Sequence, residues 1–340
     1  MTRFGRGRSF LTSFRRLPAL LAVSVAMLVP GITQAYSDTL DTILKRQRIV
    51  CGVSEGLTGF SARNADGTWS GFDVDFCKAL SAALFSATDR VDYVPLSADQ
   101  RFDALKSGKI DVLSRNSTWT MSREIGMGFH FAGTSYYDGQ SFMAPAARGW
   151  VSAMEIAGAK VCAQRGTTSD VTAKAFFAQN ALAADVVLLG TFAELRDSYA
   201  SGACDAVTAD RSALAAMRMG LDQPDAHTLL PEVISKEPLG PVVRNDDAAW
   251  ASVVRWVLFA LVNAEEQQHS SSKPPQAGAP EVPALSDRLP RDWYPNVIRL
   301  VGNYGEVFER NLGKDTPLGI ERGVNELWTQ GGLLYAPPLR

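Results

Sequence analysis

The chain is 340 residues long and carries 34 basic and 36 acidic residues, a formal net charge of −2 at pH 7. That balance, with no basic stripe, argues against a nucleic-acid-binding protein. The length is enough for two domains of ordinary size. The three histidines (130, 227 and 269) are scattered and no Cys-x-x-Cys pair is present, so neither a metal site nor a cofactor is predicted.

The first 35 residues have the features of a secretory signal peptide. They contain five arginines and no acidic residue, and the apolar run Leu17–Pro30 is followed by Gly31-Ile-Thr-Gln-Ala35. The run has 14 residues, too few to cross a bilayer as a helix, so a short membrane anchor is the weaker alternative. No cysteine marks a lipoprotein. Cleavage would leave 29 basic and 36 acidic residues, a net charge of −7, in an exported protein.

The four cysteines all lie in the exported part of the chain. An oxidising compartment and an even count predict two disulfides, and four cysteines allow three pairings. Cys51 lies in an apolar strand and Cys77 in a helix expected beside that strand. Cys162 lies in a second apolar strand, and Cys204 just precedes another. The local pairing 51–77 and 162–204 is therefore favoured over the other two.

Short apolar strands alternate with amphipathic helices, which predicts an α/β protein. The first unit has expected strands at 49–53, 91–94 and 110–113, with helices at about 76–84 and 99–107. The second has expected strands at 161–163, 186–189 and 206–208, with helices at 170–179 and 192–201. Two such units imply a cleft between them, with the chain crossing at about 140–148 and again near 237–241.

One short sequence pattern, called the step below, occurs in both units. The segments Leu105–Val112 and Tyr199–Val207 each contain the end of a helix, a Ser-Gly turn, an acidic residue and a strand. Earlier in the chain, Asp73 and Asp75 are interpreted as an N-cap and a first-turn acid, which the helix dipole favours. A catalytic carboxylate pair is the rarer alternative.

The C-terminal part has an irregular segment followed by a helix. Residues 266–290 contain five prolines and several small polar residues, typical of an irregular surface excursion. Beyond it, Trp293–Arg310 is predicted to be helical, with aromatic and aliphatic residues at helical spacing that suit core packing.

The polar stretch Ser114–Glu124 follows the apolar run 110–113 and is the strongest candidate for a ligand site. The mouth of an α/β sheet, where its strands end, is where such folds bind ligands. Hydroxyls, backbone amides and a guanidinium such as that of Arg123 together suit a carboxylate. A plain helix-capping loop with Arg123 in solvent is the alternative.

Five segments make the chain resemble a known family: 51–60 (CGVSEGLTGF), 71–77 (GFDVDFC), 112–120 (VLSRNSTWT), 131–140 (FAGTSYYDGQ) and 301–311 (VGNYGEVFERN). They resemble the polar amino-acid-binding family of periplasmic solute-binding proteins that serve ABC importers, and within it the general L-amino-acid-binding branch. The resemblance covers essentially all of residues 36–340. It implies a two-lobed periplasmic binding protein fold, each lobe an open α/β sheet, joined by a two-strand hinge.

The resemblance also implies a domain division. Lobe 1 would comprise residues 36–143 and, after a return crossing, 241–340 with a C-terminal helical extension. Lobe 2 would comprise residues 144–240. A monomer is expected, with an L-amino acid as ligand and a membrane permease as partner, in the periplasm.

Site residues follow from the resemblance position by position. Arg123 would pair with the ligand α-carboxylate, assisted by Thr118, while the backbone carbonyl of Asn116 would accept from the α-amino group. From the other lobe, the turn ending in Thr168 would give a helix-start amide to the carboxylate. Asp210 would pair with the ammonium. Since an unpaired buried charge is costly, only a closed cleft would satisfy both ends of the ligand; such hinge closure is well known for periplasmic binding proteins.

Specificity and the rival functions depend on a few further positions. Leu57 and Ala98 take the places where many relatives stack aromatics on the ligand side chain, which predicts a roomier pocket and broad specificity. Ser54 and Gln164 are weaker candidates for side-chain contacts. An enzyme of the same fold, such as a dehydratase acting on a small carboxylate, would need a proton-transfer group, and Glu55 is the nearest candidate. Because nothing pairs with Glu55, no catalytic residue is predicted.

Overall fold

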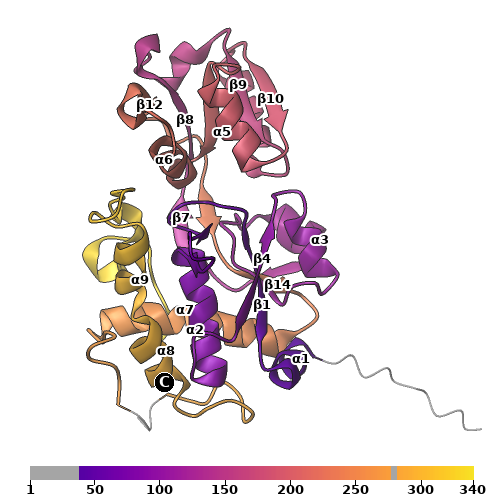
Figure 1. The fold of residues 1–340 in the computed structure, drawn as a ribbon, viewed down its shortest axis with the longest axis vertical. Helices are drawn as coiled ribbons and strands as arrows, with labels where there is room; N and C mark the ends of the chain where they lie inside the picture. Colours follow the sequence, from indigo (N-terminus) through magenta and orange to yellow (C-terminus); the bar gives the residue numbers. More distant parts are fainter. Residues whose placement is uncertain (1–37, 277–281) are drawn as a thin grey trace, which may run out of the picture. The chain divides into compact units, whose positions relative to one another are not determined.

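Two five-stranded mixed sheets organise the part of the chain that our computed structural model describes, residues 38–276 and 282–340 (Figure 1). The first has the order β4-β1-β5-β14-β6 and the second β10-β9-β11-β8-β12. The strands of the first are β1 Ile49–Ser54, β4 Val91–Leu96, β5 Val112–Leu113, β6 Phe129–Phe131 and β14 Val242–Arg244. Those of the second are β8 Gln140–Pro145, β9 Lys160–Gln164, β10 Asp185–Leu189, β11 Ala206–Asp210 and β12 His227–Leu229. The prediction of two open α/β units is confirmed.

Helices cover both sheets. Those of the first sheet are α1 Thr39–Arg46, α2 Phe72–Phe85, α3 Arg101–Lys106, α7 Ala248–Glu266, α8 Trp293–Val301 and α9 Tyr304–Asn311. Those of the second are α4 Thr168–Gln179, α5 Phe192–Ala200 and α6 Arg211–Met219. A short ribbon, β2 Ala62–Arg63 with β3 Trp69–Ser70, precedes α2. The predicted signal peptide at 1–35 lies outside the described residues.

The largest core forms where α2, α7, α8 and α9 pack together beside the first sheet (Figure 1). Its largest fully buried side chains include Trp250, Trp293, Tyr304 and Phe308. Among the described residues, α7 alone has the length and apolar composition of a membrane span. Since 61% of its apolar window is buried, α7 is the central helix of this core.

The predicted single helix over 293–310 is two helices in the structure. Gly302, at φ 96°, ends α8, and the side chain of Asn303 accepts the backbone N–H of Glu306 at 2.8 Å. The side chain of Glu306 in turn accepts the backbone N–H of Asn303 at 2.9 Å. This reciprocal capping box starts α9 and explains the break.

The step that recurs in the sequence also recurs in three dimensions. Ser107 ends α3 and Ser201 ends α5 with the same backbone angles, φ −77° and ψ −4°. Each serine hydroxyl donates to the carbonyl three residues earlier, at 3.2 and 3.1 Å. The glycines that follow, Gly108 and Gly202, have φ of 74° and 75°, which glycine adopts without steric cost.

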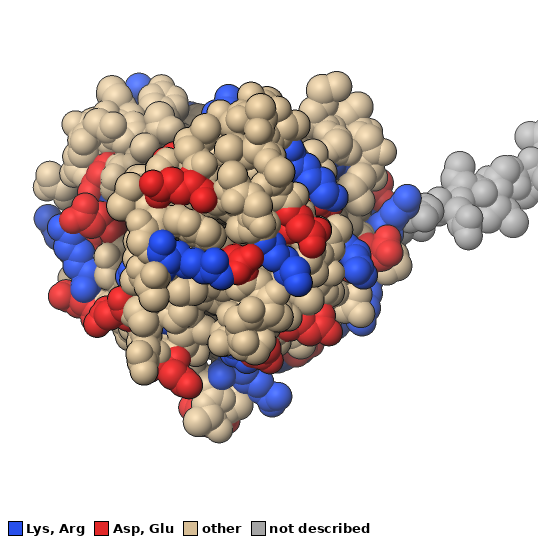
Figure 2. All heavy atoms as spheres, turned by 90° about the horizontal axis from the view of Figure 1, so that it is seen from above, with Lys and Arg blue, Asp and Glu red and all other residues tan. Residues whose placement is uncertain are grey.

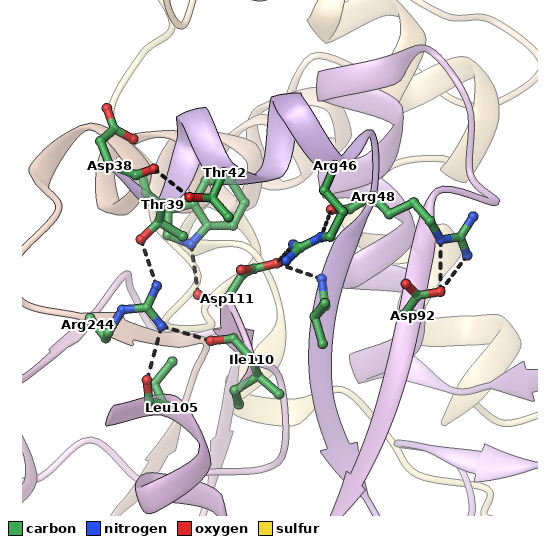
Figure 3. Close-up of polar contacts among 12 residues, drawn as sticks. Asp38, Thr39, Thr42, Arg46, Arg48, Asp92, Leu105, Ile110, Asp111 and Arg244 are labelled. Atoms are coloured by element: carbon green, nitrogen blue, oxygen red, sulfur yellow. Dashed lines mark hydrogen bonds and ion pairs between the residues drawn. The ribbon is translucent and has the colours of Figure 1, made fainter. Parts of the chain in front are cut away.

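The acidic residue of each step ties its sheet together at the end away from the predicted ligand site. Asp111 accepts the backbone N–H of Val50 at 2.7 Å and pairs with Arg46 (Figure 3). In the second sheet, Asp205 accepts the backbone N–H of Lys160 at 2.8 Å and pairs with Arg148. Both carboxylates therefore join the start of one strand to its neighbour, which is a structural role.

Both predicted disulfides are present. Cys51 in β1 is joined to Cys77 in α2 with a Cα–Cα distance of 6.4 Å. Cys162 in β9 is joined to Cys204, just before β11, with a Cα–Cα distance of 5.8 Å. Each therefore joins a strand to an adjacent element of the same unit.

Removal of either disulfide should lower the free energy of unfolding. The two loops span 26 and 42 residues, for which loop-closure entropy gives about 3.5 and 4 kcal/mol. We expect the double substitutions Cys51→Ser with Cys77→Ser, and Cys162→Ser with Cys204→Ser, each to shift urea unfolding accordingly. A change below about 1 kcal/mol in both would contradict this entropic account.

Two short strands connect the sheets. β7 Tyr136–Asp138 and β13 Glu237–Leu239 pair antiparallel, in the register Glu237 to Asp138. β8 starts at Gln140 and already belongs to the second sheet. We therefore propose that the lobes divide at β7 and β13, so that the first crossing lies slightly earlier than 140–148.

Charges of both signs are interspersed over the face shown in Figure 2. Blue and red side chains alternate there without a patch of a single sign. That face has none of the electrostatic character of a nucleic-acid interface.

Candidate functional site

One cavity is lined by residues from both sheets. All seven residues predicted to contact a ligand line it: Ser54, Asn116, Thr118, Arg123, Gln164, Thr168 and Asp210. The other lining residues are Leu57, Arg101, Arg115, Thr167, Ser169, Phe192, Leu195, Ala209 and Ala213. Its volume of about 40 Å³ is room for roughly three water molecules. An amino acid would therefore require the surrounding elements to move apart before it could enter.

The segment after β5 supplies Asn116 at an unusual backbone angle. Its φ is 23°, and its backbone N–H donates to the carboxylate of Asp73 at 3.1 Å. The side-chain oxygen of Asn116 is buried and accepts no hydrogen bond from any described residue. Burial raises the pKa of Asp73 to about 7, while the hydrogen bonds from Asn116 and Ser114 lower it. Asn116, which lines the cavity, thus keeps an unused acceptor.

Asp73 and Asp75, the two acids at the start of α2, both have structural roles. The N-cap is Gly71 rather than Asp73, because Asp73 already lies inside the first turn. Asp75 forms ion pairs with Arg310 at 2.7 Å and with Lys78 at 3.0 Å. It therefore anchors α9 to α2 and does not face a reacting group.

Arg123 is held in position by contacts with the protein itself. It lies on the short π-helical turn Ser122–Gly126 and is only 7% exposed. Its guanidinium donates to the carbonyl of Thr118 at 2.8 Å and lies 5.2 Å from the centre of the Phe102 ring. Burial lowers its pKa, and the charges of Glu237 and Asp210 act in the opposite direction. The alternative of a solvent-exposed Arg123 is excluded.

Two further arginines line the cavity, and the sequence interpretation missed them. Arg101, at the start of α3, donates to the carbonyl of Gly166 at 3.1 Å, a contact from the first unit to the second. Arg115 donates through Nε to the carbonyl of Leu96 at 2.9 Å. Burial lowers the pKa of both, that of Arg115 to about 10. Arg115 therefore remains charged at neutral pH.

The turn before α4 brings the second unit against the first. Gly166 has φ 73°, and a Cβ there would lie 2.2 Å from Oδ1 of Asp99. Thr167 caps α4 by accepting the backbone N–H of Ser169 at 3.3 Å. A side chain at position 166 would thus collide with the other unit, so glycine allows this close approach.

Glu237 connects the two units and was also missed. It lies on β13, is 2% exposed, and accepts the hydroxyl of Thr118 at 2.6 Å. The same oxygen accepts the hydroxyl of Thr168 at 2.9 Å, and the other accepts that of Ser235 at 2.6 Å. The hydroxyl of Thr118, which was expected on a ligand carboxylate, thus donates to a protein carboxylate, as does the hydroxyl of Thr168.

Asp210 ends β11 and is 8% exposed. Burial raises its pKa well above the ordinary aspartate value, and the charges of Asp138 and Glu237 add to that effect, whereas Arg123 and Arg101 oppose it. Asp138 is itself raised to a pKa of about 6 by burial. The Asp210 carboxylate would be ionised more readily with a cation beside it.

The expectation that Leu57 and Ala98 make the pocket roomier than in relatives stays a prediction. Leu57 lines the cavity together with Phe192, a ring from the second unit. Ala98 is 2% exposed and lies outside the lining. Glu55 is exposed and is likewise absent from the lining.

A polar, charge-bearing cavity between two similar α/β units suits the capture of a small zwitterion, and the comparisons agree. Residues 49–273 match the bacterial extracellular solute-binding proteins, family 3. The chain belongs to this family. Within the described residues, no group of His, Cys, Asp or Glu is arranged to hold a metal ion.

Several relatives of this solute-binding protein are similar over almost its whole length. The general L-amino acid-binding periplasmic protein AapJ of Rhizobium johnstonii is 44% identical over 94% of this chain and 98% of its own. The glutamate/glutamine/aspartate/asparagine-binding protein BztA of Rhodobacter capsulatus is 44% identical over 94% of this chain and 98% of its own. A Brucella ovis periplasmic binding protein, solved with glutathione bound, is 44% identical, with a TM-score of 0.85 over 89% of this chain and 99% of that one. These relatives are binding proteins, so the solute-binding protein described here is not an enzyme.

Proposed function

We propose that this protein captures L-amino acids between its two units and delivers them to the permease of an ABC importer in the periplasm. In this proposal Arg123 and Thr118 bind the α-carboxylate with the start of α4 at Thr168, while Asp210 and Asn116 bind the ammonium. Ser54 and Gln164 contact the side chain. The names of the relatives, which specify amino acids and the periplasm, support this assignment.

The observation that carries the proposal is the position of Arg123 and Asp210 in one cavity. They come from different sheets, the turn that follows β5 and the end of β11, yet both are buried and line the same space. Neither forms an ion pair with any residue that the structure describes. A zwitterion leaving water needs both charges answered, so a ligand that bridges them would hold the units closed. Export would use residues 1–35 as a cleaved signal peptide, and the mature protein would act as a monomer.

The test combines ligand identity with closure. The protein, denatured after purification, should release amino acids identifiable by mass spectrometry, and adding them back should raise the melting temperature, because a ligand that binds only the native state stabilises it. Small-angle scattering should show a smaller radius of gyration with the ligand bound. A panel of the common L-amino acids that leaves the melting temperature unchanged would overturn the proposal.

A further inference from the structure

The C-terminal segment, residues 320–340, contacts one of the two strands that connect the units, although ligand capture as proposed above uses none of it. Asn325 is 3% exposed and lies in the short turn Gly323–Asn325. Its side-chain oxygen accepts the backbone N–H of Tyr137 in β7 at 2.7 Å, and its side-chain nitrogen donates to the Tyr137 carbonyl at 3.0 Å. One carboxamide thus satisfies both backbone polar groups of a strand residue, as a neighbouring strand would.

The pairing of β7 with β13 explains why these two backbone groups can bond to Asn325. Tyr137 lies opposite Pro238, which has no N–H to donate, so no ladder hydrogen bond is lost at this pair. Pro238 is held from its other side, where its carbonyl accepts the backbone N–H of Trp119 at 2.8 Å. Trp119 follows β5 and Asn325 follows α9, so elements of the first unit hold the middle of each connecting strand.

Arg322 anchors the turn that carries Asn325. It donates through Nε and Nη2 to the Asn325 carbonyl at 3.1 and 2.9 Å, and it pairs with Glu265 of α7. Its guanidinium lies 5.3 Å from the centre of the Tyr304 ring of α9. Both helices belong to the largest core, so that core fixes the position of Asn325.

The side of the hinge that Asn325 contacts faces away from the ligand cavity. Thr118 and Asp210 line the cavity, whereas the residues that follow them, Trp119 and Arg211, line a groove that Asn325 also lines. The cavity and the groove therefore lie on opposite sides of the elements that connect the units. A rotation that widens the cavity narrows the groove and bends the strands between them.

The bend is restricted to places where the connecting strands are not held by the first unit. These are the step from Asp138 to Gln140, where β7 ends and β8 begins, and the residues just before Pro238. We propose that Asn325 is a positioning residue of the hinge, which confines the bend to these places and so reduces the conformational freedom that closure on a ligand removes. This inference rests on the proposed function, because it concerns closure around the captured solute.

Replacing Asn325 should weaken ligand binding without changing ligand preference. In Asn325→Ala, the backbone of about one residue of β7 gains freedom in the open protein and loses it on closure, which corresponds to about fivefold to thirtyfold in affinity. Calorimetry should give the same factor for L-glutamate and L-alanine, because Asn325 lies outside the cavity's lining. Asn325→Ser, whose hydroxyl is too short to reach both backbone groups of Tyr137, should show the same loss.

Asn263→Ala is the matched control for a purely structural effect. Asn263 is 5% exposed, and its side chain donates to the carbonyls of Phe259 and Pro337, both at 2.9 Å. The substitution therefore also removes buried hydrogen bonds, one of them to the C-terminal segment, but none to β7 or β13. It should lower the melting temperature as Asn325→Ala does and keep the wild-type affinity.

The separation of the units without ligand tests Asn325 independently of any ligand. Spin labels on Asp89→Cys and Lys174→Cys, exposed positions in the first and second unit, report this distance by electron double resonance. Asn325→Ala and Asn325→Ser should broaden the distance distribution of the ligand-free protein, whereas Asn263→Ala should leave it unchanged. Distributions as narrow as that of the wild type in the Asn325 variants that fold, as judged by melting curves, would overturn the positioning role. Failure of every amino acid to bind would overturn the proposed function, and the ligand-free distributions would still decide on Asn325.

Discussion

Replacing Arg123 with alanine is expected to weaken the binding of every amino-acid ligand by a similar factor. The guanidinium is buried, lies over Phe102 and is held by the Thr118 carbonyl, so the protein itself fixes its position. Truncating one partner of a buried charge pair costs about 2–5 kcal/mol. That corresponds to a loss of affinity of about thirtyfold to several thousandfold.

Lysine should not rescue this loss. An ammonium keeps the charge but is a single point on a flexible stem, whereas the guanidinium offers two parallel donors. Arg123→Lys should therefore weaken ligands of different size equally, because the contact is to the α-carboxylate that they share. Calorimetry with a small and a large ligand measures this, and Arg299→Ala, at an exposed position of α8, is the matched control. Binding by Arg123→Ala within about threefold of wild type would remove Arg123 from the site.

The alternation of strands and helices was predictable because both units are built in the same way, from apolar strands covered by helices. Short apolar strands that lie between helices have to be covered on both faces. The Ser-Gly turn at 107–108 recurs at 201–202, with the same backbone angles and the same hydroxyl contact, so the repeat in sequence predicts the repeat in structure. The break at Gly302 was missed although its signal, Asn303 followed by Glu306 three residues later, is local and readable.

The candidate site was predictable only in part. Asn116, Thr118 and Arg123 lie in one polar stretch after a strand, which made them visible. Arg101 and Glu237 could not be recognised as site residues, because a charged residue at a helix start or beside a proline is usually solvated. Their burial comes from tertiary contacts, such as those of Glu237 with Thr118 and Thr168, which lie 119 and 69 residues away. No sequence pattern encodes such a distance directly.

Replacing Asp210 with asparagine is expected to have an effect as large as that of Arg123→Ala. The amide of the Asp210→Asn variant would offer the ligand ammonium a dipole instead of a charge, and the ammonium would be buried without a counter-charge. We expect a loss of about 2–5 kcal/mol at neutral pH, again about thirtyfold or more in affinity. Asp222→Asn is the control, because Asp222 is an exposed acid outside the cavity's lining.

The pH dependence of binding distinguishes a direct role of Asp210 from a structural one. Burial raises the pKa of Asp210 well above the ordinary value of 3.8. The ligand ammonium favours the ionised form of Asp210, so the pKa of Asp210 is lower in the complex than without ligand. At any pH between these two pKa values, binding releases a proton from Asp210. Affinity should accordingly rise with pH through that window, by up to about tenfold per pH unit, and level off above it. The ligand's own α-groups keep their charges between about pH 5 and pH 8, so they do not produce this slope. Calorimetry across that range should show the slope in the wild type and in Asp222→Asn but not in Asp210→Asn. An equal slope in Asp210→Asn would mean that another acid binds the ammonium.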